Sequence, residues 1–500
     1  MSTQIQQNHR TIAKGAGTSL LGFVAKLGVR APFLLIAGSL YGSELFGRYV
    51  IIVALMETAS ALATYGLKRT LFKFIDDDKD DPTSPPERTI LEALFLTTAS
   101  SILFMMVFLF GSQYILGFLN SPETINALRF LSPLVVVSTI ADILLAATRF
   151  RRTMRYEALS RSVIEPLTLT STSFVLFYMG AHTNGLFIAY GLSLLAAFIT
   201  AGVGFSRLFS LKALAVSRIR RSKLVYMIQF SGPTALTELV TILLFRADVM
   251  LISYFYSDSS LGIYGMAQQF ATSVQKIHVS FNPILTPVIS SLMAEDRIDH
   301  VRDQLARVSR WILSLQLMVV VGIVFFGGQL LSLMGEGFVA GGLALTLLVL
   351  GDVLNGSFGV SDLPLLLKRP SYNLVITSIM LVVHILMGYY LTMKMGIAGA
   401  ALSLLVTYGL MNFIRIFLVK ILFGVILLDR DMLRPILVSG VCGLLVYALN
   451  PQLAALGWLG MLIGFAVIIV SYSLMMLIFG LEKTEKQYIF GRLCLYWQSR

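Results

Sequence analysis

The chain has few charged side chains and almost no cysteine. Only 13% of its 500 residues are Asp, Glu, Lys or Arg, whereas an average soluble domain has about 25%. Two cysteines, Cys442 in an apolar run and Cys494 near the end, cannot form a framework of disulfides, and we expect both to be inert thiols. The polar surface that remains is too small to cover a water-soluble particle of this length.

Signatures of catalysis and of cofactor binding are also missing. The dipeptide Gly-Lys does not occur, so the chain has no Walker A loop. The acidic run DDDKDDP at 76–82 lacks the spaced pattern and the final Glu of a calcium loop, and no zinc-ligand cluster or hydrolase elbow is found. The sequence therefore predicts a protein that is not an enzyme and that uses no cofactor and no metal.

Long apolar runs dominate the sequence instead. Hydrophobic residues make up 56% of the chain, and the mean hydropathy is +0.80. Runs of about 20 residues recur, each long enough to cross a hydrocarbon core of about 30 Å as a helix. We therefore expect an all-α, polytopic membrane protein with about fourteen transmembrane helices. The expected spans are 15–40, 44–67, 89–111, 127–148, 160–180, 185–205, 229–255, 261–290, 310–330, 341–366, 374–393, 396–420, 435–450 and 457–480.

Lysines and arginines gather in every second connection between these spans. The connections 112–126 and 256–260, on the opposite side, contain neither residue. Because short cytoplasmic loops carry the excess of Lys and Arg, the basic side, with both termini, is predicted to be cytoplasmic. The net charge of +12 then reflects loops that face anionic lipid, and nucleic acid is not expected as a partner. The basic connections include 68–88, 149–161, 206–223 and 297–310.

A short motif recurs at nearly half the length of the chain. LYGSELFGRY at 40–49 and FYSDSSLGIY at 255–264 share a Tyr, a Gly and a Tyr, and MGAHTNG at 179–185 has a shorter counterpart, MGIAG at 395–399. We infer two parallel-repeat, six-helix lobes around a central cavity, followed by two more helices; this architecture places a substrate path between the lobes. The predicted parts are a cytoplasmic N-terminus (1–14), an N-lobe (15–223), a C-lobe (224–423), two further spans (424–480) and a cytoplasmic tail (481–500).

Four basic residues lie deep inside predicted spans. They are Lys26 and Arg30 in the first span, Arg246 in the seventh and Lys276 in the eighth. A Lys or Arg at the centre of a membrane helix costs about 2.5–3.5 kcal/mol when it faces lipid, so these side chains must face protein, water or a ligand. Two explanations remain open: pairing with acids of other spans, or a hydrated cavity for an anionic substrate, which their place in repeat-related spans favours.

Acidic residues also occur within the predicted spans. Three of them, Glu57, Glu238 and Asp248, are candidates for coupling transport to protons or cations, and the alternative is that they neutralise Arg or Lys neighbours. His384 is expected to satisfy a helix contact. The acids available for pairing are Glu57, Asp142, Glu165, Glu238, Asp248 and Asp352. The basic residues near span ends, expected to snorkel to the membrane surface, are Arg48, Arg129, Lys394 and Arg415.

Proline occurs in the spans that carry the buried cations. Pro32 lies in the first span, Pro233 in the seventh, and the segment NPILTP, with Pro283 and Pro287, in the eighth. Proline removes a backbone hydrogen bond and kinks a helix. Such kinks suit elements that bend during alternating access.

These features together resemble a known superfamily. The stretches LYGSELFGRYV, FRADVMLISYFYSDSSLGIYGMA and MGIAGAALSLLVTYG, with the expected span count and the half-chain repeat, are similar to the multidrug/oligosaccharidyl-lipid/polysaccharide exporters. Within that superfamily the chain most resembles the polysaccharide-biosynthesis branch, the bacterial flippases of O-antigen or exopolysaccharide repeat units. The resemblance covers nearly the whole chain as a diffuse pattern.

The resemblance implies a flippase of the bacterial cytoplasmic membrane that moves a lipid-linked oligosaccharide, usually on undecaprenyl diphosphate, to the outer leaflet. It implies that Lys26, Arg30, Arg246 and Lys276 bind the diphosphate or acidic sugars, since Lys and Arg are natural phosphate partners. Besides membrane lipids, it suggests a polysaccharide polymerase and glycosyltransferases as partners.

Three alternatives to this function remain open. Two belong to the same superfamily: a lipid II flippase and a cation-coupled multidrug exporter. The third, from a different class, is a membrane polysaccharide polymerase or ligase. That enzyme would need an external catalytic loop, and the external connections are about 15 residues at most.

Overall fold

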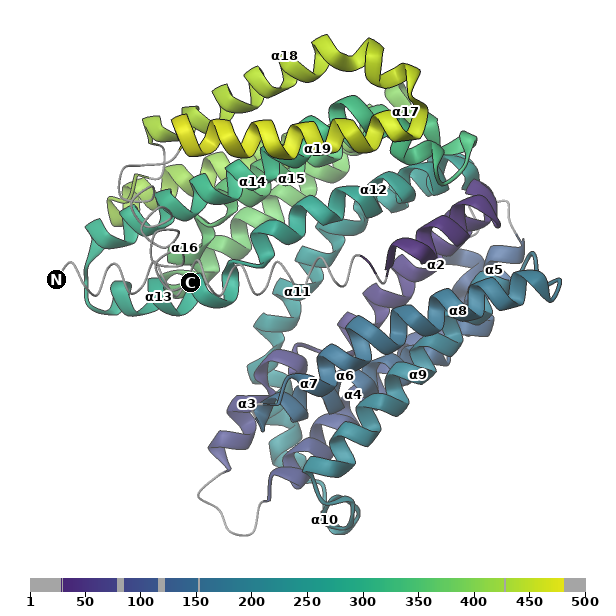
Figure 1. Cartoon of the computed structure of the whole chain (residues 1–500). Helices are drawn as coiled ribbons and strands as arrows, with labels where there is room; N and C mark the ends of the chain where they lie inside the picture. The colour runs from purple at the N-terminus through teal and green to yellow at the C-terminus, as the bar shows by residue number, and fades with distance from the viewer. Residues whose placement is uncertain are drawn as a thin grey trace, which may run out of the picture.

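The computed structural model describes residues 28, 30–78, 85–115, 122–151, 153–426 and 429–480. These residues form helices joined by short turns and contain no β-strand, so the predicted all-α fold is confirmed (Figure 1). Large apolar side chains such as Phe110 and Leu444 are exposed on the outside. This is the surface expected of a chain surrounded by lipid, where each helix satisfies its own backbone groups.

The first half of the chain forms one lobe, drawn in purple and blue in Figure 1. Residues 30–39 are helical and lead into α2. Within the lobe, α6 packs against both α4 and α9, and α8 packs against α9. The elements are α2 (Gly42–Ala63), α3 (Leu67–Asp77), α4 (Pro86–Ile115), α5 (Pro122–Leu131), α6 (Leu134–Phe150), α7 (Arg155–Glu157), the π-helix η1 (Ala158–Ile164), α8 (Glu165–Tyr178) and α9 (Gly185–Leu208).

A short helix, α10 (Leu211–Val216), connects this lobe to the second one, in which α15 packs against α17, α12 and α14. The elements of the second lobe are α11 (Arg221–Phe255), α12 (Asp258–Val279), α13 (Asn282–Ala294), α14 (Ile298–Ser332), η2 (Glu336–Gly341), α15 (Gly342–Gly359), α16 (Asp362–Lys368) and α17 (Pro370–Phe423). The elements that follow are η3 (Arg430–Met432), α18 (Leu433–Ala455), α19 (Gly457–Met475) and the π-helix η4 (Met476–Gly480).

The number of membrane spans is not confirmed at fourteen. Among the described residues, eight helices are long and apolar enough to cross a membrane, or nine if the bent pair α5–α6 counts as one. α11 and α12 are long but fall outside this set because they carry many polar and charged residues. α17 covers two predicted spans in one element, broken at Gly396, whose φ of +64° is a conformation that favours glycine.

Two predicted spans end earlier than expected. The span 261–290 is divided between α12 and α13, and α13 begins with a proline in its first turn, a position that proline favours. The span 341–366 is likewise divided between α15 and α16. The predicted boundary between the lobes, at residue 223, falls in the first turn of α11. The predicted ends, 1–14 and 481–500, lie outside the described residues.

Apolar packing forms three buried clusters. The largest contains residues of both lobes, including Phe46 of α2 and Tyr264 of α12. A second fills one end of the first lobe between α3, α4, α6 and α9. The third, which includes Cys442 as a buried free thiol, attaches α18 and α19 to α14. The two C-terminal helices are therefore packed onto the outside of the second lobe.

The repeated motifs meet each other where the two lobes join. A Cβ added at Gly47 of α2 would contact the carbonyl oxygen of Asp258 and the backbone nitrogen of Gly262, and one added at Gly262 of α12 would contact the carbonyl oxygen of Ser43 and the nitrogen of Gly47. Next to this crossing, the hydroxyls of Ser43 and Ser259 are 2.7 Å apart. Glycine at both positions is therefore required for the helices to approach so closely.

The tyrosine of each copy also has an equivalent bond. Tyr41 donates from its hydroxyl to the carbonyl of Ser173 at 2.7 Å, and Tyr256 donates to the carbonyl of Thr392 at 3.0 Å. Each bond therefore ties the start of the helix pair to a later helix of the same lobe. The sequence repeat thus corresponds to a repeated set of contacts.

Candidate substrate and coupling sites

Two of the four predicted cations have no acidic partner in ion-pair contact. Arg30 lies in the helical segment 30–39 and is exposed, and Lys276 lies in α12 and is half-buried. Lys276 interacts electrostatically with Arg30, with Asp352 of α15 and with Glu57 of α2. In the part of the chain that the structure describes, no carboxylate lies within 4 Å of either cation. Lys26 lies outside that part.

The third described cation, Arg246, is paired. Its guanidinium on α11 donates to the carboxylate of Glu57 on α2. The two side chains are 25% and 52% exposed, so the pair lies at an open surface. Of the two explanations for a cation deep in a span, pairing with an acid of another span therefore applies to Arg246 and Glu57.

Glu238 is also neutralised by an arginine. The Arg69 Nε of α3 lies 2.8 Å from a Glu238 carboxylate oxygen on α11. About two turns earlier on α11, the hydroxyls of Thr70 and Ser231 are 2.7 Å apart. These contacts hold the first half of α11 against α3 of the N-lobe.

Asp248 has a different environment from the other two candidate coupling acids. It is fully buried in α11 and accepts hydrogen bonds from the Tyr264 hydroxyl at 2.5 Å, from the Gln268 amide nitrogen at 3.1 Å and from the Val249 backbone N–H at 2.8 Å. All three donors are neutral. No Lys or Arg of the described chain lies within ion-pair distance of this carboxylate.

His384 of α17 completes this polar region of the C-lobe. It is fully buried and interacts electrostatically with Asp248. Its Nδ1 lies 3.3 Å from the hydroxyls of Ser403 and Thr407, while its Nε2 has no hydrogen-bond partner in the described structure. The sequence prediction of a simple helix contact therefore accounts for only one of the two ring nitrogens.

The N-lobe contains an ion network around a half-buried acid. Asp142 of α6 lies 3.1 Å from the Lys68 Nζ and 2.6 Å from a guanidinium nitrogen of Arg161, and Arg161 also lies 2.8 Å from Glu165. Arg161 belongs to the π-helix η1, which directly precedes Pro166 in α8. Since proline cannot donate a backbone hydrogen bond, the wide turn at this point has an identifiable cause.

Two arginines that were expected to snorkel are engaged within the protein. Arg48 of α2 lies 2.9 Å from Asp258 of α12, 2.5 Å from Glu123 of α5 and 2.6 Å from Glu44. Arg415 is only 6% exposed and donates to the Thr377 hydroxyl at 3.3 Å. The snorkelling prediction is therefore wrong for Arg415, because the guanidinium is enclosed by neighbouring helices.

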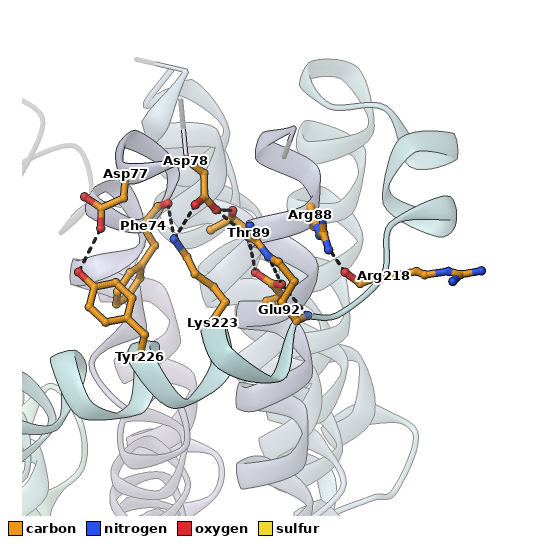
Figure 2. Close-up of polar contacts among 10 residues, drawn as sticks. Phe74, Asp77, Asp78, Arg88, Thr89, Glu92, Arg218, Lys223 and Tyr226 are labelled. Atoms are coloured by element: carbon orange, nitrogen blue, oxygen red, sulfur yellow. Dashed lines mark hydrogen bonds and ion pairs between the residues drawn. The ribbon is translucent and has the colours of Figure 1, made fainter. Parts of the chain in front are cut away.

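A second ion cluster joins α3, α4 and the start of α11 (Figure 2). Arg220 lies 2.9 Å from Glu92 and 2.7 Å from Asp78, and the Lys223 Nζ lies 2.8 Å from Asp78. Burial opposes ionisation of Asp78, but the hydrogen bonds from Lys223, Arg220 and Thr89 outweigh it and lower its pKa to about 2. The hydrogen bond to Glu92 raises the pKa of Arg220.

Metal binding is not indicated by the geometry. Within the described ranges, no group of three or more His, Cys, Asp or Glu side chains is arranged to hold a metal ion. Asp248 and His384 are only two potential ligands, and their other polar neighbours include hydroxyls. The arrangement is suited to the uptake of a proton or of a small cation by one carboxylate.

Comparison with known proteins identifies the fold. A solved structure described as "Lipid II flippase MurJ, inward closed conformation" matches with a TM-score of 0.74 at 16% identity, over 92% of this chain and 98% of that one. An inward-facing multidrug resistance MATE family transporter of the MOP superfamily matches with a TM-score of 0.62 at 14% identity, over 80% of this chain and 98% of that one. The chain therefore has the fold of membrane transporters of this superfamily.

Sequence relatives define the family more narrowly. Residues 40–340, more than half of the chain, match the family described as "Polysaccharide biosynthesis protein", and the chain belongs to that family. The "Probable flippase AglR" of Haloferax volcanii is 24% identical over 376 residues, which are 74% of this chain and 75% of the relative. The predicted resemblance to the exporter superfamily is thus confirmed, and the relatives are described as flippases and transporters, not as enzymes.

Proposed function

We propose that this protein translocates a polyprenyl-diphosphate-linked oligosaccharide repeat unit across the bacterial cytoplasmic membrane, with both termini in the cytoplasm, for the synthesis of a surface polysaccharide. One observation carries the proposal: Arg30 and Lys276 lie close enough to interact, yet neither has a carboxylate in ion-pair contact within the described chain. Two cations whose charges repel each other are stabilised by a shared anion, and a diphosphate supplies one.

The pairing of Arg246 adds a binding step to this proposal. Because Arg246 and Glu57 are partly exposed, an anionic headgroup can replace Glu57 on the guanidinium without first opening a packed core. Lys26 would contribute a further charge from the first span. The lipid tail would stay in the bilayer while the headgroup crosses between the lobes.

The contacts between the lobes support alternating access as the mechanism. α2 and α12 are held together by the Gly47–Gly262 crossing, by the Ser43–Ser259 bond and by the ion pair of Arg48 with Asp258. A path that opens on this side requires these contacts to separate. The predicted orientation makes this the external side, so the described state would receive its cargo from the cytoplasmic leaflet.

Among the three candidate coupling acids, Asp248 is the one we propose to couple transport to a proton or cation. Glu57 and Glu238 are each bound to an arginine, whereas Asp248 is held by neutral donors only. A carboxylate without a basic partner can bind a proton or cation without breaking an ion pair. Transport that is unaffected by collapse of both the proton and the sodium gradients would contradict this role.

Arginine and lysine substitutions test the cargo site. We expect Arg30→Ala and Lys276→Ala each to reduce surface polysaccharide at least tenfold in cells, while the protein stays in the membrane. Lys394→Ala is the matched control, because Lys394 contacts the hydroxyl and ring of Tyr390 on its own helix, α17, and is not among the charges that act on Lys276. Normal polysaccharide in both variants would contradict the proposal.

A reconstituted assay separates the related functions. Purified protein in vesicles is supplied with undecaprenyl-diphosphate oligosaccharide, with lipid II or with a cationic drug, and the flipped or exported fraction is measured. We expect the oligosaccharide lipid to be moved fastest. Selective movement of lipid II would assign the lipid II flippase instead, and movement of the drug alone would assign the exporter.

A further inference from the structure

The connection between the two lobes carries an exposed surface that is both basic and apolar. It leaves α9 at Leu208, forms α10 and enters α11 at Arg221. Ser210 caps α10 by accepting a hydrogen bond from the Ala213 N–H at 3.2 Å, so the turn is a folded element. We call the following exposed residues the linker rim: Arg207, Leu211, Lys212, Val216, Arg218, Ile219 and Arg221.

The basic side chains of this connection fall into two groups. Arg220 and Lys223 are bound by Asp78 and Glu92 in the cluster of Figure 2. The four basic side chains of the linker rim are exposed and have no acidic partner within ion-pair distance in the described chain. Two further acids of this region are engaged by neutral donors: Glu87 accepts a hydrogen bond from the Ser210 N–H, and Asp77 accepts one from the Tyr226 hydroxyl. Among the residues that the structure describes, no acid therefore neutralises the positive charge of the rim by ion-pair contact.

The position of the rim relative to lipid follows from α9. Leu195, Ile199 and Val203 are exposed apolar side chains, and each is four residues from the next. Residues four apart lie on one face of a helix, so these three form a row that faces lipid. Arg207 is the next member of the same row. The lipid-facing surface therefore changes from apolar to basic at the start of the linker, as expected at the edge of the hydrocarbon core.

The apolar members of the rim are unusually exposed for a segment in water. Val216 is 81% exposed, Leu211 54% and Ile219 40%. Lys212 and Val216 are one helical turn apart, which places a basic and an apolar side chain side by side. Apolar side chains that enter the headgroup region, flanked by bases that reach the phosphates, are typical of segments that lie in a membrane surface.

A neighbouring loop extends this surface. Arg151, after α6, stacks on the ring of Phe209 with its guanidinium carbon 5.1 Å from the ring centre. Met154 is 71% exposed, and Arg155 is exposed as well. The two loops therefore present the same combination of side chains at the same end of the N-lobe.

We propose that the linker rim binds the headgroups of anionic phospholipids, with Leu211 and Val216 in the headgroup–acyl boundary and the four basic side chains on lipid phosphates. Each base near an anionic membrane surface adds to the electrostatic attraction, so four give a clear preference over zwitterionic lipid. An acidic protein partner would match the charge, but it would not explain why the basic rim continues the lipid-facing row of α9. This surface is independent of the cargo proposed above.

Lipid contact can be measured with a single fluorophore. The variant Val216→Cys/Cys494→Ser is labelled with an environment-sensitive dye, since Cys442, the other thiol, is fully buried. The full-length protein is reconstituted in vesicles of phosphatidylcholine and phosphatidylglycerol, and quenching by spin-labelled lipid of each type is compared. We expect phosphatidylglycerol to be enriched about fivefold at the dye, which corresponds to about 1 kcal/mol, and the enrichment to disappear in about 1 M salt, where the Debye length is only about 3 Å.

Two variants provide matched comparisons. A dye at Leu343→Cys, at the start of α15 next to η2, should be quenched equally by both lipids. The variant K212E/R218E should lose the enrichment at residue 216. Equal quenching by both lipids at low salt would overturn the proposal, as would no quenching by either. Protection of the dye from quenching only after a soluble acidic protein is added would also overturn it. The salt series uses the labelled protein without charge substitutions, so it does not depend on the folding of the charge variants.

Discussion

The two lobes have equivalent contacts at one end and different chemistry inside. In the N-lobe, Asp142 is bound by Lys68 and Arg161, so the half-buried carboxylate is neutralised by cations. In the C-lobe, Asp248 is bound by Tyr264 and Gln268, which are neutral. The repeat therefore determines the arrangement of the helices, and the residues between them determine what each lobe can do.

This difference separates a structural acid from a candidate coupling acid. Removing one partner from a buried ion pair leaves an unpaired charge, which is costly, so the N-lobe network is suited to holding helices in place. A carboxylate held by neutral donors keeps those hydrogen bonds when it binds a cation. The C-lobe site is therefore the one in which a change of occupancy can accompany transport.

The largest effect is expected from removing the two acids in turn. Asp142→Asn leaves Lys68 without a counter-charge and leaves Arg161 with Glu165 alone, and we expect a loss of about 3 kcal/mol in the free energy of unfolding. Asp248→Asn keeps an oxygen acceptor for Tyr264, and we expect a loss of at most about 1–2 kcal/mol but a loss of ion coupling. Denaturation of both purified variants in detergent measures the difference. An equal free energy of unfolding for the two variants would contradict the distinction between a structural acid in the N-lobe and a coupling acid in the C-lobe.

Alanine at the two crossing glycines tests whether the lobes are equivalent where they meet. Gly47→Ala and Gly262→Ala each place a Cβ against a backbone carbonyl, and we expect each to cost about 1–3 kcal/mol in the free energy of unfolding. Gly440→Ala is the control, since nothing lies within 4 Å of an added Cβ there and the change should be neutral or stabilising. Thermal unfolding of the three variants provides the test, and a large loss in only one of the two crossing variants would break the equivalence.

A smaller effect is expected at the two tyrosines. Tyr41→Phe and Tyr256→Phe each remove one hydroxyl that donates to a backbone carbonyl, and we expect a loss of about 1 kcal/mol in the free energy of unfolding for each. The two losses should agree within about 0.5 kcal/mol and should add in the double variant, because the sites are separate. A strongly non-additive double variant would show that the two sites are coupled.

The smallest effect is expected from pH at the Asp78 cluster. The pKa of Asp78 is lowered from its ordinary value of 3.8 to about 2, so its contribution to stability is fully present above about pH 4 and is lost as the pH falls through about 2. Unfolding of the wild type and of Asp78→Asn is compared between pH 7 and pH 2. The gap in stability between them should narrow at the acid end. A constant gap would show that ionisation of Asp78 does not stabilise this junction.

Much of the fold follows from apolar run length and from the repeat. Gly47 and Gly262 could be recognised in sequence as equivalent, because each occupies the same place in a short repeated motif. The division of α12 from α13 could not, since a proline inside an apolar run is compatible with either a kinked helix or a new one. The break of α17 at Gly396 was predicted because glycine and a turn motif coincide there.

The partners of the buried charges could not be predicted. Sequence position identifies Arg246 and Glu57 as deep in their helices, but their pairing depends on how α2 and α11 face each other. The neutral donors Tyr264 and Gln268 were missed, although their spacing of four residues on α12 was a usable signal. Arg415 differs from the prediction because closeness to a span end does not ensure access to water: neighbouring helices cover its side chain.

One helix belongs mechanically to both lobes. α11 is fixed at its start to the N-lobe through Arg220 and Lys223, and its later part packs against α17 in the C-lobe. The lobes therefore cannot rotate as two independent rigid bodies, because a relative rotation must twist or bend α11. Pro233 lacks one backbone hydrogen bond but lies among the contacts to α3, between Ser231 and Glu238, so the bending falls on the part of α11 between Glu238 and the segment that packs against α17.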